Sequence, residues 1–211
     1  MINFNEENKA LIESLIALGV LKTKRVIEAF KKIPRHLFVP EKYLSHAYSD
    51  IALPSIGEQT ISQPYTVAVM LEALSPESGD NILDIGSGTG WTTCLLAKIV
   101  GKKGKVTGMD IEQKLVDFAK ENITKTEVKN IELVLGDGKK GYSPNASYDC
   151  ILINAACDSV PELVTDQVKI GGRIVVPINA DGHQIMTLFQ KIGEGELNQA
   201  NLGDYIFVDL K

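Results

Sequence analysis

Cysteine is scarce in this sequence, which has only Cys94, Cys150 and Cys157 among its 211 residues. An odd number without metal-ligand spacing gives no basis for a metal site, and none is predicted. Cys150 and Cys157 lie in or beside an apolar run, where a free cysteine behaves as a small hydrophobic residue.

Long hydrophobic runs are also missing. No apolar stretch reaches the roughly 18 residues that a membrane-spanning helix needs. The opening sequence, MINFNEENKA, is polar and acidic and is unlike a secretory signal. We therefore expect a cytoplasmic protein that makes no membrane contact.

A concentration of positive charge is absent as well. The formal net charge is −5, whereas binding to a phosphate backbone usually requires a basic face. The densest basic stretches, FKKIPR at 30–35 and GKKGK at 101–105, are typical of solvated helix ends and turns. This balance of charge argues against nucleic acid as the main partner.

What is present is the composition of an ordinary globular protein, with 44% hydrophobic and 23% charged residues, at a length that suits one domain. We divide the single domain 1–211 into a helical lobe over 1–79 and an α/β core over 80–211. In the lobe, apolar periodicity predicts helices at 5–19 (capped by Asn5), 23–34 (capped by Thr23) and 39–48, and a further helix that starts at Pro64.

The core alternates strands with helices, which indicates a parallel sheet. Strands are expected at 81–86, 105–110, 130–138 (with its exit loop), 148–157 and 171–178, and helices at 91–100, 112–123 and 160–170. Two later apolar stretches, 183–192 and 204–210, are expected to pair as antiparallel strands. The pattern predicts an α/β fold with a doubly wound sheet and an antiparallel edge.

The strongest motif is LDIGSGTG at 83–90, where a strand runs through three glycines directly into a helix. Glycines let the backbone turn sharply and approach a ligand closely. The spacing differs from the dinucleotide fingerprint, which has two residues before its last glycine. Asp84, on the strand before the loop, would be poorly placed beside a pyrophosphate but suits a cationic ligand. S-adenosyl-L-methionine (SAM) is such a ligand, because it carries an α-ammonium and a sulfonium.

Two further acids support SAM. Asp110 ends the second core strand, where a carboxylate can accept hydrogen bonds from both ribose hydroxyls. Asp137, in the sequence GDG after the third strand, can accept one from an adenine amino group. A lone acid at a strand end is usually a solvated loop residue, but the combination with this glycine loop indicates SAM as the cofactor.

Residues 80–211 resemble class I SAM-dependent methyltransferases in the glycine loop, the acid after the second strand and KIGGRIVVP at 169–177. That resemblance implies a Rossmann-like sheet of seven strands, mostly parallel, with a C-terminal antiparallel hairpin. The whole chain resembles protein-L-isoaspartate O-methyltransferases in five segments: PRHLFVP (34–40), YSDIALPSIGEQTISQP (48–64), LDIGSGTGW (83–91), GDG (136–138) and VPELVTDQVKIGGRIVVPI (160–178). The hydroxyl-rich GEQTISQP is the most specific of these.

This resemblance implies that the methyl group of SAM passes to the α-carboxyl of an L-isoaspartyl residue in a damaged protein or peptide. The products would be a methyl ester and S-adenosyl-L-homocysteine. Ser62 is the implied catalytic residue. The expected cofactor-binding residues are Gln59, Thr60, Ile61, Ser62, Asp84, Gly86, Ser87, Gly88, Thr89, Gly90, Asp110, Ile111, Gly136, Asp137 and Gly138. The expected substrate-binding residues are Ile56, Gly57, Thr60, Ser62, Ala155, Ala156, Val176 and Pro177.

The chemistry is consistent with these residue types. A peptide carboxyl group, with a pKa of about 3.5 to 4, is ionised at neutral pH and needs no general base. The enzyme must supply alignment and exclusion of water. A hydroxyl can hold a carboxylate without quenching its nucleophilicity, so we expect Ser62 to orient the acceptor rather than to attack. The structural alternative for Ser62 and Thr60 is capping of the helix that starts at Pro64.

Four residues depart from the family pattern: Val67, Asn154, Asn179 and Asp209. They concern substrate detail more than the reaction class. Other functions stay open, namely a specialised peptide or small-molecule carboxyl methyltransferase, a nucleic-acid methyltransferase, or a non-catalytic SAM-binding module. Against a nucleic-acid enzyme, NAAC stands after the fourth strand where an Asp/Asn-Pro-Pro-aromatic motif is usual. We expect a monomer.

Overall fold

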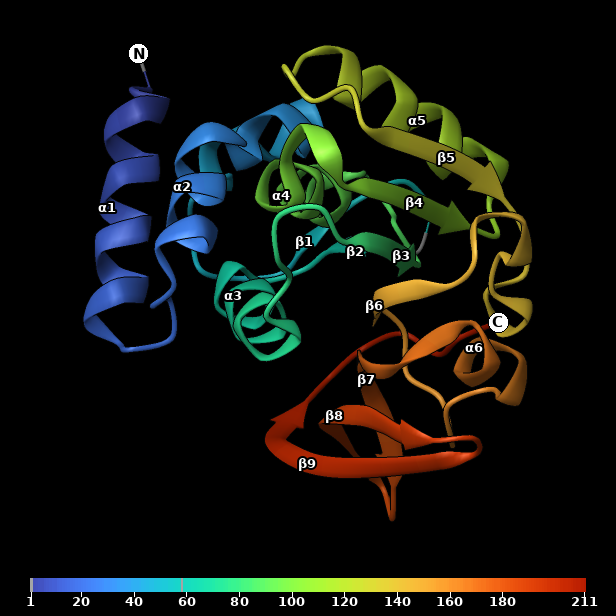
Figure 1. Cartoon of the computed structure of the whole chain (residues 1–211). Helices are drawn as coiled ribbons and strands as arrows, with labels where there is room; N and C mark the ends of the chain where they lie inside the picture. The colour runs from blue at the N-terminus through green and yellow to red at the C-terminus, as the bar shows by residue number, and fades with distance from the viewer. Residues whose placement is uncertain (1, 58) are drawn as a thin grey trace.

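A seven-stranded sheet runs through the centre of the computed structural model, which describes residues 2–57 and 59–211 (Figure 1). The strand order is β5-β4-β3-β6-β7-β8-β9. The first five strands in this order are parallel, and β8 and β9 are antiparallel. This confirms the predicted fold class. The strands are β3 (Asn81–Ile85), β4 (Lys105–Asp110), β5 (Ile131–Leu135), β6 (Tyr148–Ile153), β7 (Val168–Ala180), β8 (His183–Gly193) and β9 (Glu196–Tyr205).

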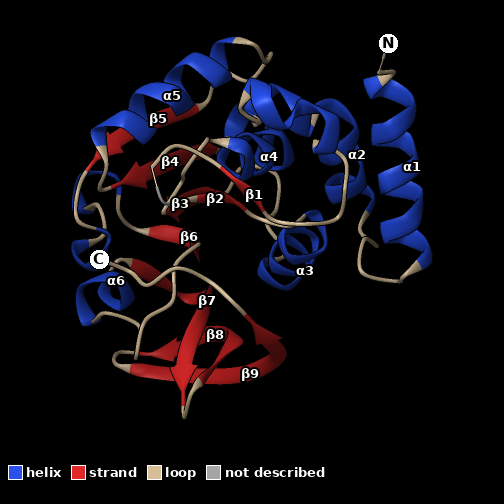
Figure 2. Cartoon of the chain, turned by 180° about the vertical axis from the view of Figure 1, so that it is seen from behind, coloured by secondary structure: helices blue, strands red, loops and turns tan. Residues whose placement is uncertain are grey.

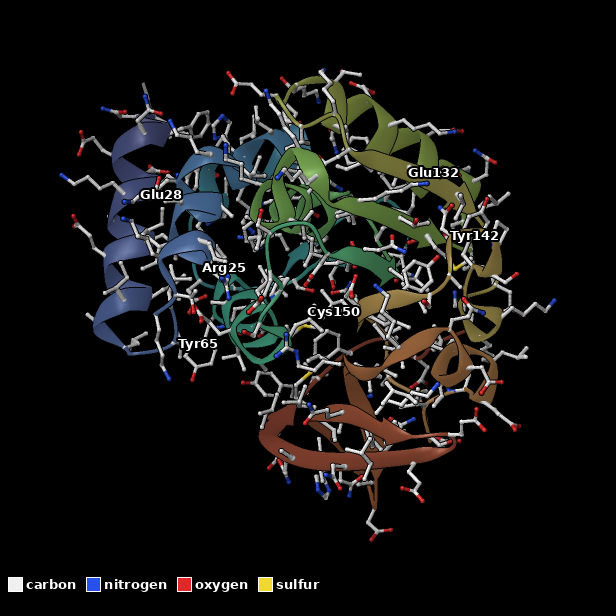
Figure 3. All side chains as sticks on the ribbon, in the orientation of Figure 1. Arg25, Glu28, Tyr65, Glu132, Tyr142 and Cys150 are labelled. Carbon is white, nitrogen blue, oxygen red and sulfur yellow. The ribbon has the colours of Figure 1, made fainter. Side chains whose placement is uncertain are left out.

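The central strands are apolar because both faces of the sheet are covered. Alternate residues of β3 and β6 belong to two different hydrophobic clusters: Ile82 and Leu152 to one, Leu83 and Ile151 to the other. The side chain of Cys150, labelled in Figure 3, lies on β6 in the first cluster. Successive residues of these strands therefore face the two sides of the sheet in turn.

The first cluster is the larger and joins the N-terminal lobe to the core. Figure 2 shows the lobe helices on the same side of the sheet as α4. Leu15, Phe30 and Leu71 of the lobe share this cluster with Leu95 of the core. On the other face, Val164 of the short helix α6 packs in the second cluster. The helices are α1 (Phe4–Ala17), α2 (Lys24–Lys32), α3 (Pro64–Leu74), α4 (Trp91–Val100), α5 (Gln113–Thr124) and α6 (Glu162–Asp166).

Several predicted boundaries in the lobe need correction. The first helix begins at Phe4, and its N-cap is Asn3, not Asn5; the Asn3 side chain accepts from the backbone N of Glu6. Thr23 precedes α2 without a side-chain cap, because its hydroxyl donates instead to Glu72 of α3. The predicted helix at 39–48 is a 3-10 helix over Glu41–His46.

Two predictions in the core were wrong in extent. The helix expected at 160–170 ends at Asp166, because β7 already begins at Val168. The second hairpin strand is Glu196–Tyr205 and not 204–210. The reason is exposure: β9 is the edge strand and most of its residues face solvent, so it lacks the apolar pattern that marks a buried strand.

The segment between the lobe and α3 forms a small structure of its own. Leu53–Pro54 (β1) pairs with Thr60–Ile61 (β2) as a two-stranded antiparallel sheet. The sequence did not indicate these strands. No helix in the part of the chain described here is long and apolar enough to cross a membrane.

Candidate active site

A cavity of about 960 Å³ opens where the carboxyl ends of β3, β4 and β6 meet the segment 59–67. This is the position at which open α/β sheets bind ligands. A third wall comes from residues 202–211, which follow and include the end of β9. Glu58 lies outside the described residues.

Most of the predicted cofactor residues line this cavity. They are Gln59, Thr60, Ile61, Ser62, Gly86, Ser87, Gly88, Thr89, Asp110, Ile111, Gly136 and Gly138. Of the predicted substrate residues, Ala155 also lines it, together with Thr60 and Ser62. One cavity therefore joins the glycine loop to the hydroxyl-rich segment.

The glycine loop has the geometry that its sequence predicts. Gly86, Gly88 and Gly90 have φ values of 72°, 53° and 86°, in the left-handed region that favours glycine. The backbone N–H groups of Gly86 and Ser87 donate to the carbonyl of Met109 on β4, at 2.8 and 2.9 Å. Gly90 does not line the cavity; it precedes α4, and a Cβ there would lie 3.2 Å from the Cβ of Ala119.

Asp110 ends β4 inside the cavity, as expected. Its carboxylate accepts from the backbone N of Gly88 at 3.0 Å and from that of Glu112 at 3.1 Å. Burial raises the pKa of Asp110 above its ordinary value, and the two backbone hydrogen bonds oppose that shift.

Asp84 is placed differently from the prediction, because it does not line the cavity. Its side chain is fully buried, and it accepts from the Thr93 hydroxyl at 2.5 Å and from the Asn154 amide at 2.7 Å. Burial raises the pKa of Asp84 to about 7. This carboxylate can therefore act on a ligand through its electrostatic field or through its hydrogen-bonded neighbours, but not by direct contact.

Two acids near the glycine loop, Asp84 and Asp110, are buried beside the cavity. Neither Asp84 nor Asp110 forms an ion pair with any described residue, and the charge of Asp110 further raises the pKa of Asp84. Two buried carboxylates near one cavity make it favourable to a cation.

Ser62 does not cap the following helix. The N-cap of α3 is Gln63, without a side-chain cap of its own. Asp50 serves the first turn instead, since it accepts from the backbone N of Tyr65 at 2.8 Å and from the Gln63 amide at 3.2 Å. Figure 3 labels Tyr65 at this end of α3. The capping alternative for Ser62 and Thr60 is thus not used, and both residues line the cavity.

Arg35 ends the basic stretch FKKIPR, which we expected to be solvated, but the structure buries it, and sequence reasoning missed its role. The residue is 1% exposed, and its guanidinium donates to five backbone carbonyls, at 2.9 to 3.4 Å. It also lies 5.3 Å from the ring centre of Trp91. The carbonyls belong to Ala47, Ser49, Ile51, Ile61 and Ser62. Arg35 therefore fixes the segment that carries Ser62. The available signal in the sequence was an arginine close to the apolar run at 37–39.

The terminal segment, residues 206–211, was also missed as a cavity wall. Its Val208 carbonyl accepts from the N of Ala156 at 2.8 Å, and its Leu210 N donates to the Ala156 carbonyl at 2.7 Å. Ala156 consequently faces this segment rather than the cavity. In Figure 1 the red chain crosses back from β9 to end beside α6.

Several other predicted residues do not line the cavity. Asp137 caps a 3-10 turn by accepting from the backbone N of Lys139 at 2.9 Å. Val176 and Pro177 are buried in β7, where the Pro177 carbonyl accepts from Cys157 N. Ile56 and Gly57 lie in the turn between β1 and β2, outside the lining residues.

A Rossmann-like sheet with an acid-bearing glycine loop and a terminal antiparallel hairpin defines the class of SAM-dependent methyltransferases. A family model described as protein-L-isoaspartate(D-aspartate) O-methyltransferase matches residues 6–211. The chain belongs to this family.

Individual relatives agree with the family model. The chain is 39% identical over 208 residues to a protein-L-isoaspartate O-methyltransferase of Methanopyrus kandleri, covering 98% of this chain and 92% of the relative. It is 42% identical over 205 residues to that of Methanoculleus marisnigri, covering 97% and 91%.

Solved structures show the same fold. A protein-L-isoaspartate O-methyltransferase superposes with a TM-score of 0.88 at 32% identity, covering 96% of this chain; the chain spans 65% of that longer protein. A Plasmodium falciparum β-aspartate methyltransferase, solved with S-adenosyl-L-homocysteine, gives a TM-score of 0.86 at 24% identity, with 97% and 98% coverage. The second similarity concerns the fold.

Proposed function

We propose that this chain transfers the methyl group of SAM to the α-carboxyl of L-isoaspartyl residues in damaged proteins and peptides. The observation that carries the proposal is that the Gln59–Gln63 segment and the glycine loop line one cavity. Family membership and the names of the relatives support the same reaction.

The charge of the nearby acids and the position of the cavity support SAM as its ligand. Asp110 stands where it can accept from ribose hydroxyls, and Ile111, Gly136 and Gly138 leave an apolar space beyond it for a purine. When bound, SAM supplies an electrophilic methyl group on a positively charged sulfur. The uncompensated charge of the buried acids favours that cation over an anionic nucleotide.

The acceptor needs orientation rather than activation. Its carboxylate is already ionised at neutral pH, and no histidine is among the described residues that line the cavity. Ser62 donates a hydrogen bond to one carboxylate oxygen, and Arg35 fixes the Ser62 backbone by donating to its carbonyl. The oxygen attacks the methyl carbon as the carbon–sulfur bond breaks, so no proton has to be moved.

We further propose that the chain acts as one catalytic domain and as a cytoplasmic monomer, with neither nucleic acid nor membrane as a partner. The shared core cluster of lobe and core supports a single domain. The net charge of −5 supports the absence of a nucleic-acid partner. Asp137 does not itself line the cavity, but the two glycines beside it do, and we propose that this short segment contacts the adenine.

The test uses isotopically labelled SAM and two synthetic peptides that differ only in an isoaspartyl or an aspartyl linkage. We expect base-labile label in the isoaspartyl peptide alone. Label in neither peptide, or equal label in both, contradicts the proposal.

The role of Ser62 is tested separately. Ser62→Ala should lower kcat/KM about tenfold to a thousandfold, as loss of an orienting hydrogen bond does, while the Kd for SAM stays within about threefold. Ser159→Ala, at an exposed position outside the cavity lining, is the matched control. An equal loss of SAM affinity would show that Ser62 serves the cofactor instead.

A further inference from the structure

Asn154 is held at the junction of the two central strands. It follows β6 directly, and its backbone N donates to the carbonyl of Ile85 at the end of β3, at 2.8 Å. Its side chain packs against the first glycine of the loop, since a Cβ on Gly86 would lie 3.6 Å from the Asn154 Cβ. The residue lines the cavity.

The orientation of the Asn154 amide is fixed by its two neighbours on β3. The Nδ2 group donates to Asp84 Oδ1 at 2.7 Å and to the backbone carbonyl of Ile85 at 3.4 Å, and a carbonyl oxygen can only accept. The carbonyl Oδ1 must therefore point the other way. This Oδ1 is buried and has no hydrogen-bond partner among residues 2–57 and 59–211. Buried acceptors are rarely left unpaired, so a missing partner is expected to be a ligand group.

The order of the strands indicates which part of the cofactor lies next to Asn154. In the proposed binding mode Asp110 on β4 accepts from the ribose, which puts the purine toward β5, beside Gly136. The methionine portion must then extend the opposite way, past β3 to the end of β6. Asn154 stands at that end, and its carbonyl oxygen is a hydrogen-bond acceptor.

Resting on the proposed function, we propose that the Asn154 Oδ1 accepts a hydrogen bond from the α-ammonium of SAM. The ammonium has three donors and no acceptor, which matches an unpaired carbonyl oxygen. The hydrogen bond from Nδ2 to Asp84 polarises the amide and makes its oxygen a stronger acceptor. Asn154 thus transmits the charge of Asp84, which cannot itself reach the cavity, to a cationic ligand.

The experiment measures binding of three ligands by calorimetry. SAM and S-adenosyl-L-homocysteine both carry the α-ammonium, whereas 5′-methylthioadenosine lacks the amino-acid portion. Asn154→Leu should weaken the first two about tenfold to a hundredfold, as loss of a hydrogen bond to a charged group does, and leave the third within about twofold.

The control and a second variant keep the test decisive. Asn179 donates to Asp158 at 3.0 Å in an exposed amide–carboxylate pair outside this cavity, so Asn179→Leu should change none of the three affinities. If Asn154→Leu does not fold, Asn154→Thr keeps a hydroxyl for Asp84 but removes the carbonyl, and the same selectivity is expected.

Three results would overturn the inference. If Asn154→Leu binds SAM with unchanged affinity, the proposed contact does not exist. If it loses affinity for methylthioadenosine as much as for SAM, the substitution has distorted the site in general. If affinity falls for SAM but not for S-adenosyl-L-homocysteine, Asn154 contacts the methylsulfonium and not the α-ammonium. Failure of the wild-type protein to bind SAM at all would instead refute the proposed function, so the two failures are distinguishable.

Discussion

Single residues of the site carry charge without compensation. Asp84 and Asp110 are buried acids with no ion pair to any described residue, and Arg35 is a buried cation bonded only to neutral carbonyls. Burying such groups is unfavourable unless hydrogen bonds or a ligand offset the loss of hydration. We therefore expect a substitution at each of the three to change the free energy of unfolding.

Asp84 gives a prediction about pH. Because burial raises its folded-state pKa to about 7, from an ordinary value of 3.8, its contribution to stability is fully present below about pH 4 and is lost as the pH rises through 7. Without ligand, Asp84→Asn should therefore flatten the fall in unfolding free energy between pH 4 and 7, by an amount on the order of a few kcal/mol.

Urea denaturation at a series of pH values measures this slope. Asp117→Asn, an exposed acid on α5, is the control and should leave the slope unchanged. An Asp84→Asn profile parallel to that of the wild type would show that this carboxylate does not titrate in the native protein near neutrality.

Arg35 gives a prediction about stability. Arg35→Met keeps the apolar stem but leaves five carbonyls without their donor, so the unfolding free energy should fall by about 3 to 5 kcal/mol. The control is Arg25→Met, because Arg25 on α2, labelled in Figure 3, pairs with Glu77 at 3.7 Å with both side chains exposed. That exposed pair should contribute less than about 1 kcal/mol. If both variants lost the same unfolding free energy, the five hydrogen bonds of Arg35 would contribute no more than an exposed ion pair.

Elements with strong local signals could be predicted from the sequence. The predicted strand before Gly86, glycine bend and α4 agree with the structure because each depends on nearby residues: a buried apolar run, glycines at positive φ, and a helix start. β9 could not be predicted, because an exposed edge strand needs no apolar alternation. The shortness of α6 depends on the pairing of Val168 with Tyr148, a tertiary contact.

The terminal segment (206–211) gives a prediction at the level of an element. Leu210 packs against Gly138 and Phe207 bonds to Gln184, so the segment closes one wall of the cavity. Deleting residues 207–211 should raise the dissociation rate of SAM by roughly tenfold or more while the association rate changes little. Stopped-flow fluorescence of Trp91, the single tryptophan and a lining residue, measures both rates.

Ile192→Ser is a suitable control, since it removes an apolar side chain, 49% exposed, that does not line the cavity. An unchanged dissociation rate in the deletion variant would show that the terminal segment does not retain the cofactor.

At the scale of the whole molecule, the site is assembled from segments far apart in the chain. Ser62, Gly88 and Leu210 line the same cavity although they come from the lobe, the core and the terminal segment. The motifs identified the first two, because family resemblance and glycine spacing are local properties of sequence. The closeness of the third depends on how Ala156 pairs with residues 208–210, which no local pattern encodes.

This assembly predicts how a ligand stabilises the protein. A ligand that contacts lobe, core and terminal segment binds the folded chain alone, so SAM at 100 times its Kd should raise the unfolding free energy by about 2.7 kcal/mol. Trp91 donates to the Ile33 carbonyl of the lobe at 3.2 Å, so its fluorescence reports on the contact between the two parts, while far-UV circular dichroism reports on the sheet and helices. Because one core cluster spans both parts, the two signals should shift together in urea, with and without SAM. A shift in the fluorescence transition alone would mean that the lobe unfolds independently and that SAM stabilises only its contact with the core.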